Sequence, residues 1–391
     1  MNRINQSDQS TIPLIAFVAA TAVELTTGLV INALPAIVSA LTDAGRLNAE
    51  TAGYVVGIDL GAQVAGGLLF LGQGRRRRLS TSLSFGLALV VIGNALSCLS
   101  VSTIGLIATR LVAGLGAGLV RSAYFALLSF AESPSRAVAR LTISQIVVMA
   151  AAFSIFPLFT HRVGWFGPYL FLSILGTVMF ATLSWWPRKV PLEKTESVSL
   201  SFGSAGVVCL LGVFLYWVAQ DGLWAFAEAI GVALGQSRTA ITSALALVGI
   251  PGGIASLLAY VIAPRLSTTR ALTLGLCLTL SSLYVLTLHL GSSWTLLVGL
   301  GLFYFAWCLT APFAFAAAVE CDPKRNTASA FIVAVGIGVA VGPACAGHIV
   351  QNRGTLTLMA LTACCATVSI GLFALAVAQG KGLFAARTDA A

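Results

Sequence analysis

Four consecutive arginines, Arg75 to Arg78, stand between two long apolar segments, and they constrain the fold more than any other feature of the sequence. The hydrocarbon core of a bilayer strongly disfavours charged side chains, so neither flanking segment can carry this cluster into a membrane. The arginines therefore predict a short loop between two membrane-spanning helices. Basic residues stay on the cytoplasmic side during membrane insertion, so we expect this loop to face the cytoplasm.

The composition also indicates a membrane protein. Of the 391 residues, 58% are apolar and 9% are charged, and the mean hydropathy is +0.95. Soluble proteins carry about 25% charged residues, so this chain has too little polar surface to cover a soluble globule. The 39 glycines are typical of spanning helices, which pack closely through small residues.

Apolar segments of spanning length account for most of the sequence. Because a helix crosses a bilayer with about 20 residues, we divided the chain where charges, prolines and polar clusters interrupt such runs. The first apolar stretch is much longer than a signal-peptide core of about 7 to 15 residues, so we expect it to remain as the first span. The division predicts an all-α integral membrane protein with twelve transmembrane helices, at approximately 12–41, 50–73, 79–99, 103–130, 138–160, 165–187, 203–235, 240–263, 271–290, 294–319, 327–350 and 355–379.

The basic residues are distributed unevenly across these spans. With both termini cytoplasmic, 16 of the 22 lysines and arginines lie in inner segments, four lie in outer connections and two lie within a span. This asymmetry follows the positive-inside rule. It predicts a multi-pass protein of the cell inner membrane, and it explains the net charge of +9 without a nucleic-acid partner.

The chain divides into two similar halves. The longest polar interruption follows the sixth span, so we expect two pseudo-symmetric six-helix bundles, residues 1–187 and 202–391, joined by a cytoplasmic linker at 188–201. The fourth span ends in FAESPSRAVAR, from Phe130, and the tenth in VECDPKRNTAS, from Val319. An acid, a proline and a basic residue at equivalent places are what duplication of a six-helix unit predicts.

Three motifs accompany this arrangement. The fourth span contains an arginine followed by spaced glycines: Arg110, Gly114, Gly116 and Gly118. The loop after the second span combines glycine and arginine: Gly72, Gly74, Arg75 and Arg76. Span eleven contains a glycine and proline pattern: Gly338, Gly342, Pro343 and Gly347.

With the twelve spans, these motifs resemble the major facilitator superfamily over essentially the whole chain. The resemblance implies the fold of that family, in which the first and fourth helices of each half line a central cavity. Two features depart from the family pattern. Leu71 stands where the family usually carries an aspartate, and the glycine and proline pattern lies in span eleven, whereas the family's drug and proton antiporters carry it in span five.

Six ionisable residues lie within predicted spans, where a charge is costly: Glu24, Asp59, Arg110, Arg121, Asp221 and Glu228. Because the resemblance places spans one, four and seven around the cavity, we expect Glu24 or Asp221 to carry a coupling proton. Arg110 or Arg121 is expected to modulate it, since a nearby cation changes the proton affinity of an acid. Arg110 has a second possible role in organising neighbouring helices. Asp59 has two alternatives to proton coupling, as a partner of Arg121 or as a cap at a helix kink.

Aromatic residues gather in two of the predicted cavity helices: Tyr216, Trp217 and Trp224 in span seven, and Tyr304 and Trp307 in span ten. They predict a stacking wall for a planar or cationic substrate, with ordinary interior packing as the alternative. Glu228 is a candidate substrate contact, or else it lies at the outer water interface.

Other chemistry finds little support in the sequence. The eight cysteines show no C-x-x-C spacing and read as packing residues. His161, His289 and His348 fall near the outer face without ligand spacing, so no metal site is expected. A phosphate-binding loop is absent, so ATP is not expected to drive the protein directly, and no cofactor is predicted beyond a coupling proton. The arginine cluster could attract anionic lipid, although topology explains it already.

These features predict a monomeric secondary active transporter, not an enzyme, that moves a small organic molecule by alternating access. Four spanning acids against two arginines favour proton-driven export of a cationic or neutral amphiphilic substrate. One alternative is proton-coupled import of an organic anion or metabolite, with Arg110 or Arg121 as its partner. Another is a membrane receptor or assembly subunit that transports nothing.

Overall fold

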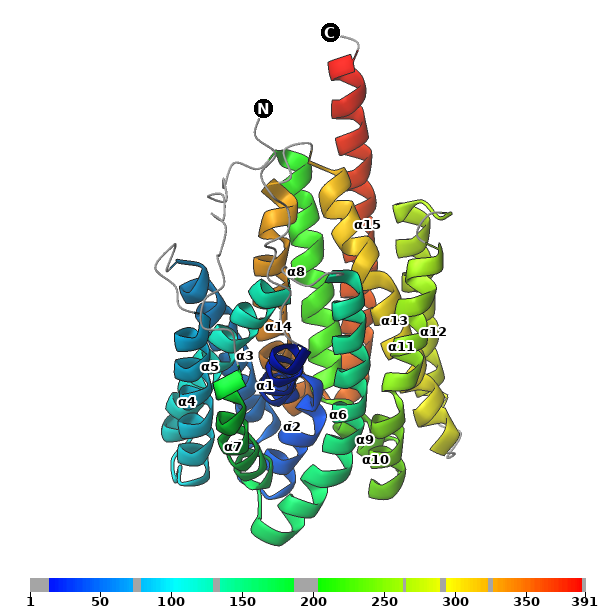
Figure 1. Cartoon of the computed structure of the whole chain (residues 1–391). Helices are drawn as coiled ribbons and strands as arrows, with labels where there is room; N and C mark the ends of the chain where they lie inside the picture. Colours follow the sequence, from blue (N-terminus) through cyan, green and yellow to red (C-terminus); the bar gives the residue numbers. More distant parts are fainter. Residues whose placement is uncertain are drawn as a thin grey trace, which may run out of the picture.

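The computed structural model describes residues 14–72, 79–128, 134–185, 203–262, 265–288, 293–322 and 326–388. Most of its helices lie side by side along one direction (Figure 1). The predicted linker at 188–201, the loop residues Gly74 and Arg75 to Arg78, and His289 lie outside the described residues. The division into halves at this linker therefore stays a prediction.

The helices follow the predicted apolar segments. In the first half they are α1 Leu14–Asn32, α2 Leu34–Asp43, α3 Ala49–Gly72, α4 Leu79–Cys98, α5 Thr103–Leu128, α6 Pro134–Val163, α7 Gly167–Phe180 and the short 3-10 helix η3 Ala181–Trp185. In the second half they are α8 Ser204–Ala225, α9 Ala227–Ala233, α10 Arg238–Leu247, α11 Gly249–Ile262, α12 Thr268–Thr287, α13 Ser293–Glu320, α14 Asn326–Arg353 and α15 Thr355–Thr388.

The prediction of twelve spans is confirmed. Within the described ranges, eleven segments are long and apolar enough to cross a membrane, and the bent pair α1 and α2 makes a twelfth. The two helices of this pair meet at 53°. Pro35 stands at the start of α2, where its missing N–H and its ring prevent α1 from continuing as a straight helix. The first span is thus broken near Ala33, which the apolar pattern did not predict.

Small residues set how closely the helices approach. Side chains in place of Gly114 and Gly118 would overlap the backbone oxygens of Asp59 and Gln63, so the predicted glycines of α5 allow it to pack directly on α3. A Cβ at Gly342 would lie 2.7 Å from the Val218 oxygen. Gly342 therefore serves the packing of α14 on α8, within the second half.

The two halves meet where α3 packs on α14 and where α6 packs on α10 and α11. We call the end of the molecule where α2 ends and α3 begins the outer end, and the opposite end, where α13 ends and α14 begins, the inner end. A Cβ on Gly347 would lie 2.5 Å from the Ala49 oxygen and 3.1 Å from the Gly53 Cα. In the glycine and proline pattern of span eleven, Pro343 and Gly347 therefore lie on the contact between the halves, whereas Gly338 and Gly342 face α8.

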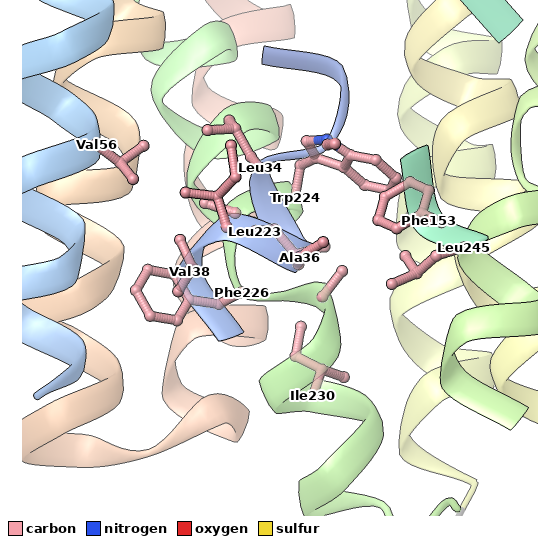
Figure 2. Packing of buried hydrophobic residues seen from close by; sticks show 14 of the residues in the cluster. Leu34, Ala36, Val38, Val56, Phe153, Leu223, Trp224, Phe226, Ile230 and Leu245 are labelled. Carbon is pink, nitrogen blue, oxygen red and sulfur yellow. The ribbon is translucent and has the colours of Figure 1, made fainter. Parts of the chain in front are cut away.

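A continuous apolar core fills the seam between the halves toward the outer end. Figure 2 shows Leu34 and Val38 of α2 close to Leu223 and Phe226 of the second half. The same core includes Phe153 of α6 and Trp224 of α8, whose ring centroids are 6.1 Å apart. Side chains from both halves thus close this part of the seam to water.

Candidate functional site

A buried ion pair joins the first and fourth spans. The Nε of Arg121 in α5 donates to the Oε1 of Glu24 in α1 at 3.0 Å, and the hydroxyl of Thr27 donates to the Oε2 of Glu24 at 3.4 Å. The Glu24 side chain is fully buried, whereas the Arg121 side chain is 31% exposed. Two of the predicted proton-coupling residues are therefore in direct contact, and the arginine is the more accessible of the two.

A second buried pair lies within the first half. Arg110 donates from Nη1 to Asp59 at 3.4 Å, from Nη2 to Asn94 at 3.0 Å and from Nε to Ser97 at 3.1 Å. Its guanidinium also lies 4.3 Å from the ring centroid of Tyr169. Arg110 thus links α3, α4, α5 and α7. The suggested pairing of Asp59 with Arg121 is wrong, because the two arginines lie on different turns of α5 and Arg110 faces α3.

The third spanning acid that was predicted to couple protons has no such partner. Asp221 in α8 is 1% exposed, and neither of its carboxylate oxygens has a hydrogen-bond partner among the described residues. The side-chain amide of its neighbour Gln220, which is fully buried, has none there either. The structure therefore separates Asp221 from both Arg110 and Arg121.

The predicted aromatic wall divides into two groups. Trp224 and Tyr304 have ring centroids 5.3 Å apart, and Tyr304 and Trp307 have theirs 5.7 Å apart. These three rings join α8 to α13. Tyr216 and Trp217, by contrast, form a buried pair that contacts Phe331 of α14, so these two residues belong to the core of the second half.

Polar contacts between the halves occur at the outer end. Arg238 of α10 forms an ion pair with Asp43 of α2, donates to the Ser39 hydroxyl at 3.2 Å and lies 3.9 Å from Glu228 of α9. Burial raises the pKa of Glu228 to about 7; the Ser39 hydroxyl and Arg238 lower it in part, and the Asp43 carboxylate adds to the rise. Glu228 is therefore part of the outer contact between the halves.

A second outer contact involves one of the three histidines. The Nδ1 of His348 in α14 lies 2.9 Å from the Oε1 of Glu50 in α3, and the Ala49 amide donates to the Gln351 side chain at 3.1 Å. No group of histidine, cysteine and acidic side chains within the described residues has the arrangement of a metal site. His348 therefore contributes to the contact between α3 and α14.

Two cavities follow the facing sides of α11 and α13. A small one of 40 Å³ lies between the halves, lined by Asn32 of α1, Gln145 of α6, and Gly252, Tyr304 and Cys308 of the second half, among others. A larger one of 920 Å³ begins one turn further along the same helices, and its lining includes Ser256, Tyr260, Pro312, Phe313, Thr268 and Glu320. The large cavity therefore lies within the second half, toward the inner end, and the small one lies between the halves.

Sequence reasoning missed several residues of this arrangement. Asn32 and Gln145 line the small cavity, and Asp43 and Arg238 join the halves at the outer end. An amide side chain within an apolar span is a recognisable signal that points to the first two residues. Nothing in the sequence pairs Asp43 with Arg238, because the two residues lie 195 positions apart.

Comparison with known proteins identifies the fold. No protein-family model matches the sequence, and no curated protein matches it. The crystal structure of a D-xylose–proton symporter is similar, with a TM-score of 0.72 and 14% identity over 95% of this chain and 99% of that one. The inward-open xylose transporter XylE from E. coli has a TM-score of 0.71 and 15% identity, over 91% and 94% of the two chains. The chain therefore has the major facilitator fold.

Proposed function

We propose that this protein is a secondary active transporter that moves a small organic molecule across the inner membrane by alternating access. The observation that carries the proposal is a seam between the halves that is closed at its outer end and encloses a small polar cavity. Its outer end is closed by apolar packing and by the Arg238–Asp43 and His348–Glu50 contacts, and side chains from both halves line its small cavity. Rocking of the halves would open the outer end.

The small cavity marks the place where a substrate would be held between the halves. Its polar lining comes from both halves, with Asn32 and Gln145 on one side and Tyr304 on the other. At 40 Å³ it has room for a few waters, which need about 10–15 Å³ each, and is far smaller than a ligand pocket of roughly 300 Å³. Separation of α6 from α11 would therefore accompany substrate entry.

We assign proton coupling to the Glu24–Arg121 pair. A proton added to Glu24 would cancel the carboxylate charge that holds Arg121, and the partly exposed guanidinium would then be free to move. Arg110 is engaged by Asp59, Asn94 and Ser97, so its role here is to hold α3, α4 and α5 together. The same engagement disfavours Arg110 as the partner of an imported organic anion.

The experiment is transport in proteoliposomes. Purified protein is reconstituted with a pH-sensitive dye inside the vesicles, and a panel of cationic, neutral and anionic compounds is tested with the proton gradient in either direction. We expect one class of compound to cause proton movement in vesicles that contain the wild type. For export, the compound and the proton should move in opposite directions. Glu24→Gln should abolish the proton movement while substrate binding is kept. A protein that moves no compound in either direction contradicts the proposal.

A further inference from the structure

The polar side chains of α8 are buried without partners near the seam. Asp221 and Gln220 are at most 1% exposed, and their side-chain oxygens have no hydrogen-bond partner within the described part of the chain. An unpaired charge in an apolar interior is costly, and so is an unsatisfied amide. Asp221 therefore requires either a bound proton or a positively charged group that the described residues do not supply.

The arginines close to the seam are already engaged. Arg121 is paired with Glu24, Arg110 with Asp59, and Arg238 with Asp43 at the outer end. Among the described residues, no ion pair involves Asp221. Asp221 thus differs from Glu24, which could accept an external cation only by releasing the arginine that it holds.

The surroundings of Asp221 suit an organic cation. On a helix, residues three and four apart share a face, so Asp221 lies between Trp217, in the core of the second half, and Trp224, in the core of the seam. The Trp224 ring packs against Tyr304, which lines the small cavity between the halves. Aromatic faces attract ammonium groups, and the attraction is strongest where water is excluded. A carboxyl group and two aromatic rings are therefore combined beside the proposed substrate site.

We propose that Asp221, with Trp224 and Tyr304, binds the ammonium group of an organic amine, and that the amine and a proton compete for this carboxyl group. The inference rests on the proposed transport function and names its substrate class. The exchange is balanced: the protonated acid releases its proton as the ammonium ion binds, and the returning proton displaces the amine. Because Asp221 holds one positive charge at a time, amine and proton binding at this site exclude each other, and the conformational step that completes the exchange still depends on the Glu24–Arg121 pair.

Binding of matched probes to the purified full-length protein tests this proposal. Benzylamine and tryptamine carry an ammonium group, and benzyl alcohol and tryptophol are their uncharged counterparts. Binding is measured by the thermal unfolding midpoint and by calorimetry between pH 5 and pH 9. We expect the amines, and not the alcohols, to raise the unfolding midpoint. In the acidic range the amine affinity should fall up to tenfold for each unit by which the pH is lowered. Up to one proton should be released for each amine bound.

Variants of the acid show whether Asp221 is responsible. Asp221→Asn should lose amine binding at least tenfold, whereas Asp221→Glu, which keeps a carboxyl group, should retain it and its dependence on pH. Asp322→Asn is the matched control, since Asp322 lies beyond the inner end of α13 and bonds Thr327. This variant should bind the amines like the wild type.

Three results overturn the proposal: equal binding of alcohols and amines, amine binding that survives in Asp221→Asn, or no amine binding by the wild type at any pH. Should Asp221→Asn fail to fold, proton release by the wild type decides, and amine binding without proton release rejects the competition. Uptake of a neutral or anionic compound that depends on Glu24, without amine binding, would retain the transport function and reject this site alone.

Discussion

Arg121 Nε lies 3.0 Å from Glu24 Oε1, and this contact joins the broken first span to the fourth span inside the first half. Each residue compensates the charge of the other, and the Glu24 side chain is fully buried from water. Removing one partner of a buried ion pair leaves an uncompensated charge, whereas removing both leaves none. The two residues should therefore behave as a unit.

This relationship predicts strong coupling between two substitutions. Arg121→Gln should lower the unfolding midpoint, and adding Glu24→Gln to that variant should restore part of the loss, with a coupling energy of about 1–3 kcal/mol. The measurement is a double-mutant cycle of unfolding in detergent. As a control, Glu24→Gln combined with Arg238→Gln should be additive, because these residues share no partner among the described side chains. Additivity in the Glu24 and Arg121 cycle would show that the pair is not formed.

The interactions of Arg110 predict that it is needed for the first half to fold. Arg110→Ala removes the guanidinium that compensates Asp59 and bonds Asn94 and Ser97, so it should cost about 3–5 kcal/mol of stability. Arg110→Lys should recover only part, because an ammonium group cannot reproduce the planar set of donors. Unfolding midpoints and yields of folded protein check this order. A transport defect in Arg110→Lys at wild-type stability would instead place Arg110 in the coupling step.

The fold was largely predictable because a bilayer imposes simple rules on sequence. Apolar runs predicted the twelve spans, and Gly114 lies where α5 packs closely on α3. The break at Ala33 was missed, because hydropathy averages over the whole segment and Pro35 is itself compatible with a spanning helix.

The site was predictable in composition but not in pairing. Sequence placed Glu24, Arg121 and Asp221 within spans, yet the choice of partner depends on how each helix is rotated about its axis. Asp59 illustrates this, since α3 turns it toward Arg110. Tyr216 and Trp217 are aromatic residues of the type that forms a stacking surface for a substrate, but the rotation of α8 places them in the core.

The contact between α3 and α14 predicts a matched pair of glycine variants. A Cβ at Gly53 would overlap the carbonyl oxygen of Pro343 and lie 3.1 Å from the Gly347 Cα, whereas a Cβ at Gly61, on the same helix, would meet the Ala340 Cβ at 3.6 Å, an ordinary contact. Gly53→Ala should therefore cost about 1–3 kcal/mol through overpacking. Gly61→Ala should be neutral or stabilising by up to about 1 kcal/mol, since alanine favours helix.

Unfolding midpoints and transport rates of the two glycine variants provide the measurement. Gly53→Ala should show a lower midpoint and slower transport, because it separates the halves where α3 packs on α14. The prediction fails if the two variants have the same midpoint, since the two glycines differ mainly in what their added methyl groups would contact.

The outer contact of Glu228 predicts that closure of the outer end depends on pH. Its pKa is about 7 when it is buried beside Asp43, Ser39 and Arg238, whereas a glutamate that opening exposes to water has a pKa near 4.3. The closed state therefore binds the proton more tightly. The free energy that favours closure is greatest below pH 4.3. It decreases as the pH rises toward 7 and changes little above pH 7.

Each unit of pKa difference corresponds to about 1.4 kcal/mol. The difference between the pKa of Glu228 in the closed and open states therefore changes the free energy of closure by roughly 3–4 kcal/mol between pH 4.3 and pH 7. Distances between spin labels placed at the outer ends of α2 and α10 should show a larger open population at pH 7.5 than at pH 5. The glutamine of Glu228→Gln is uncharged at all pH values, so this variant should remain closed across the range. Glu50→Gln is the control, because it alters the separate contact with His348. This variant should keep the dependence on pH from 5 to 7.5. An open population in the wild type that increases as the pH falls would reverse the sign of the linkage and exclude Glu228 as its cause.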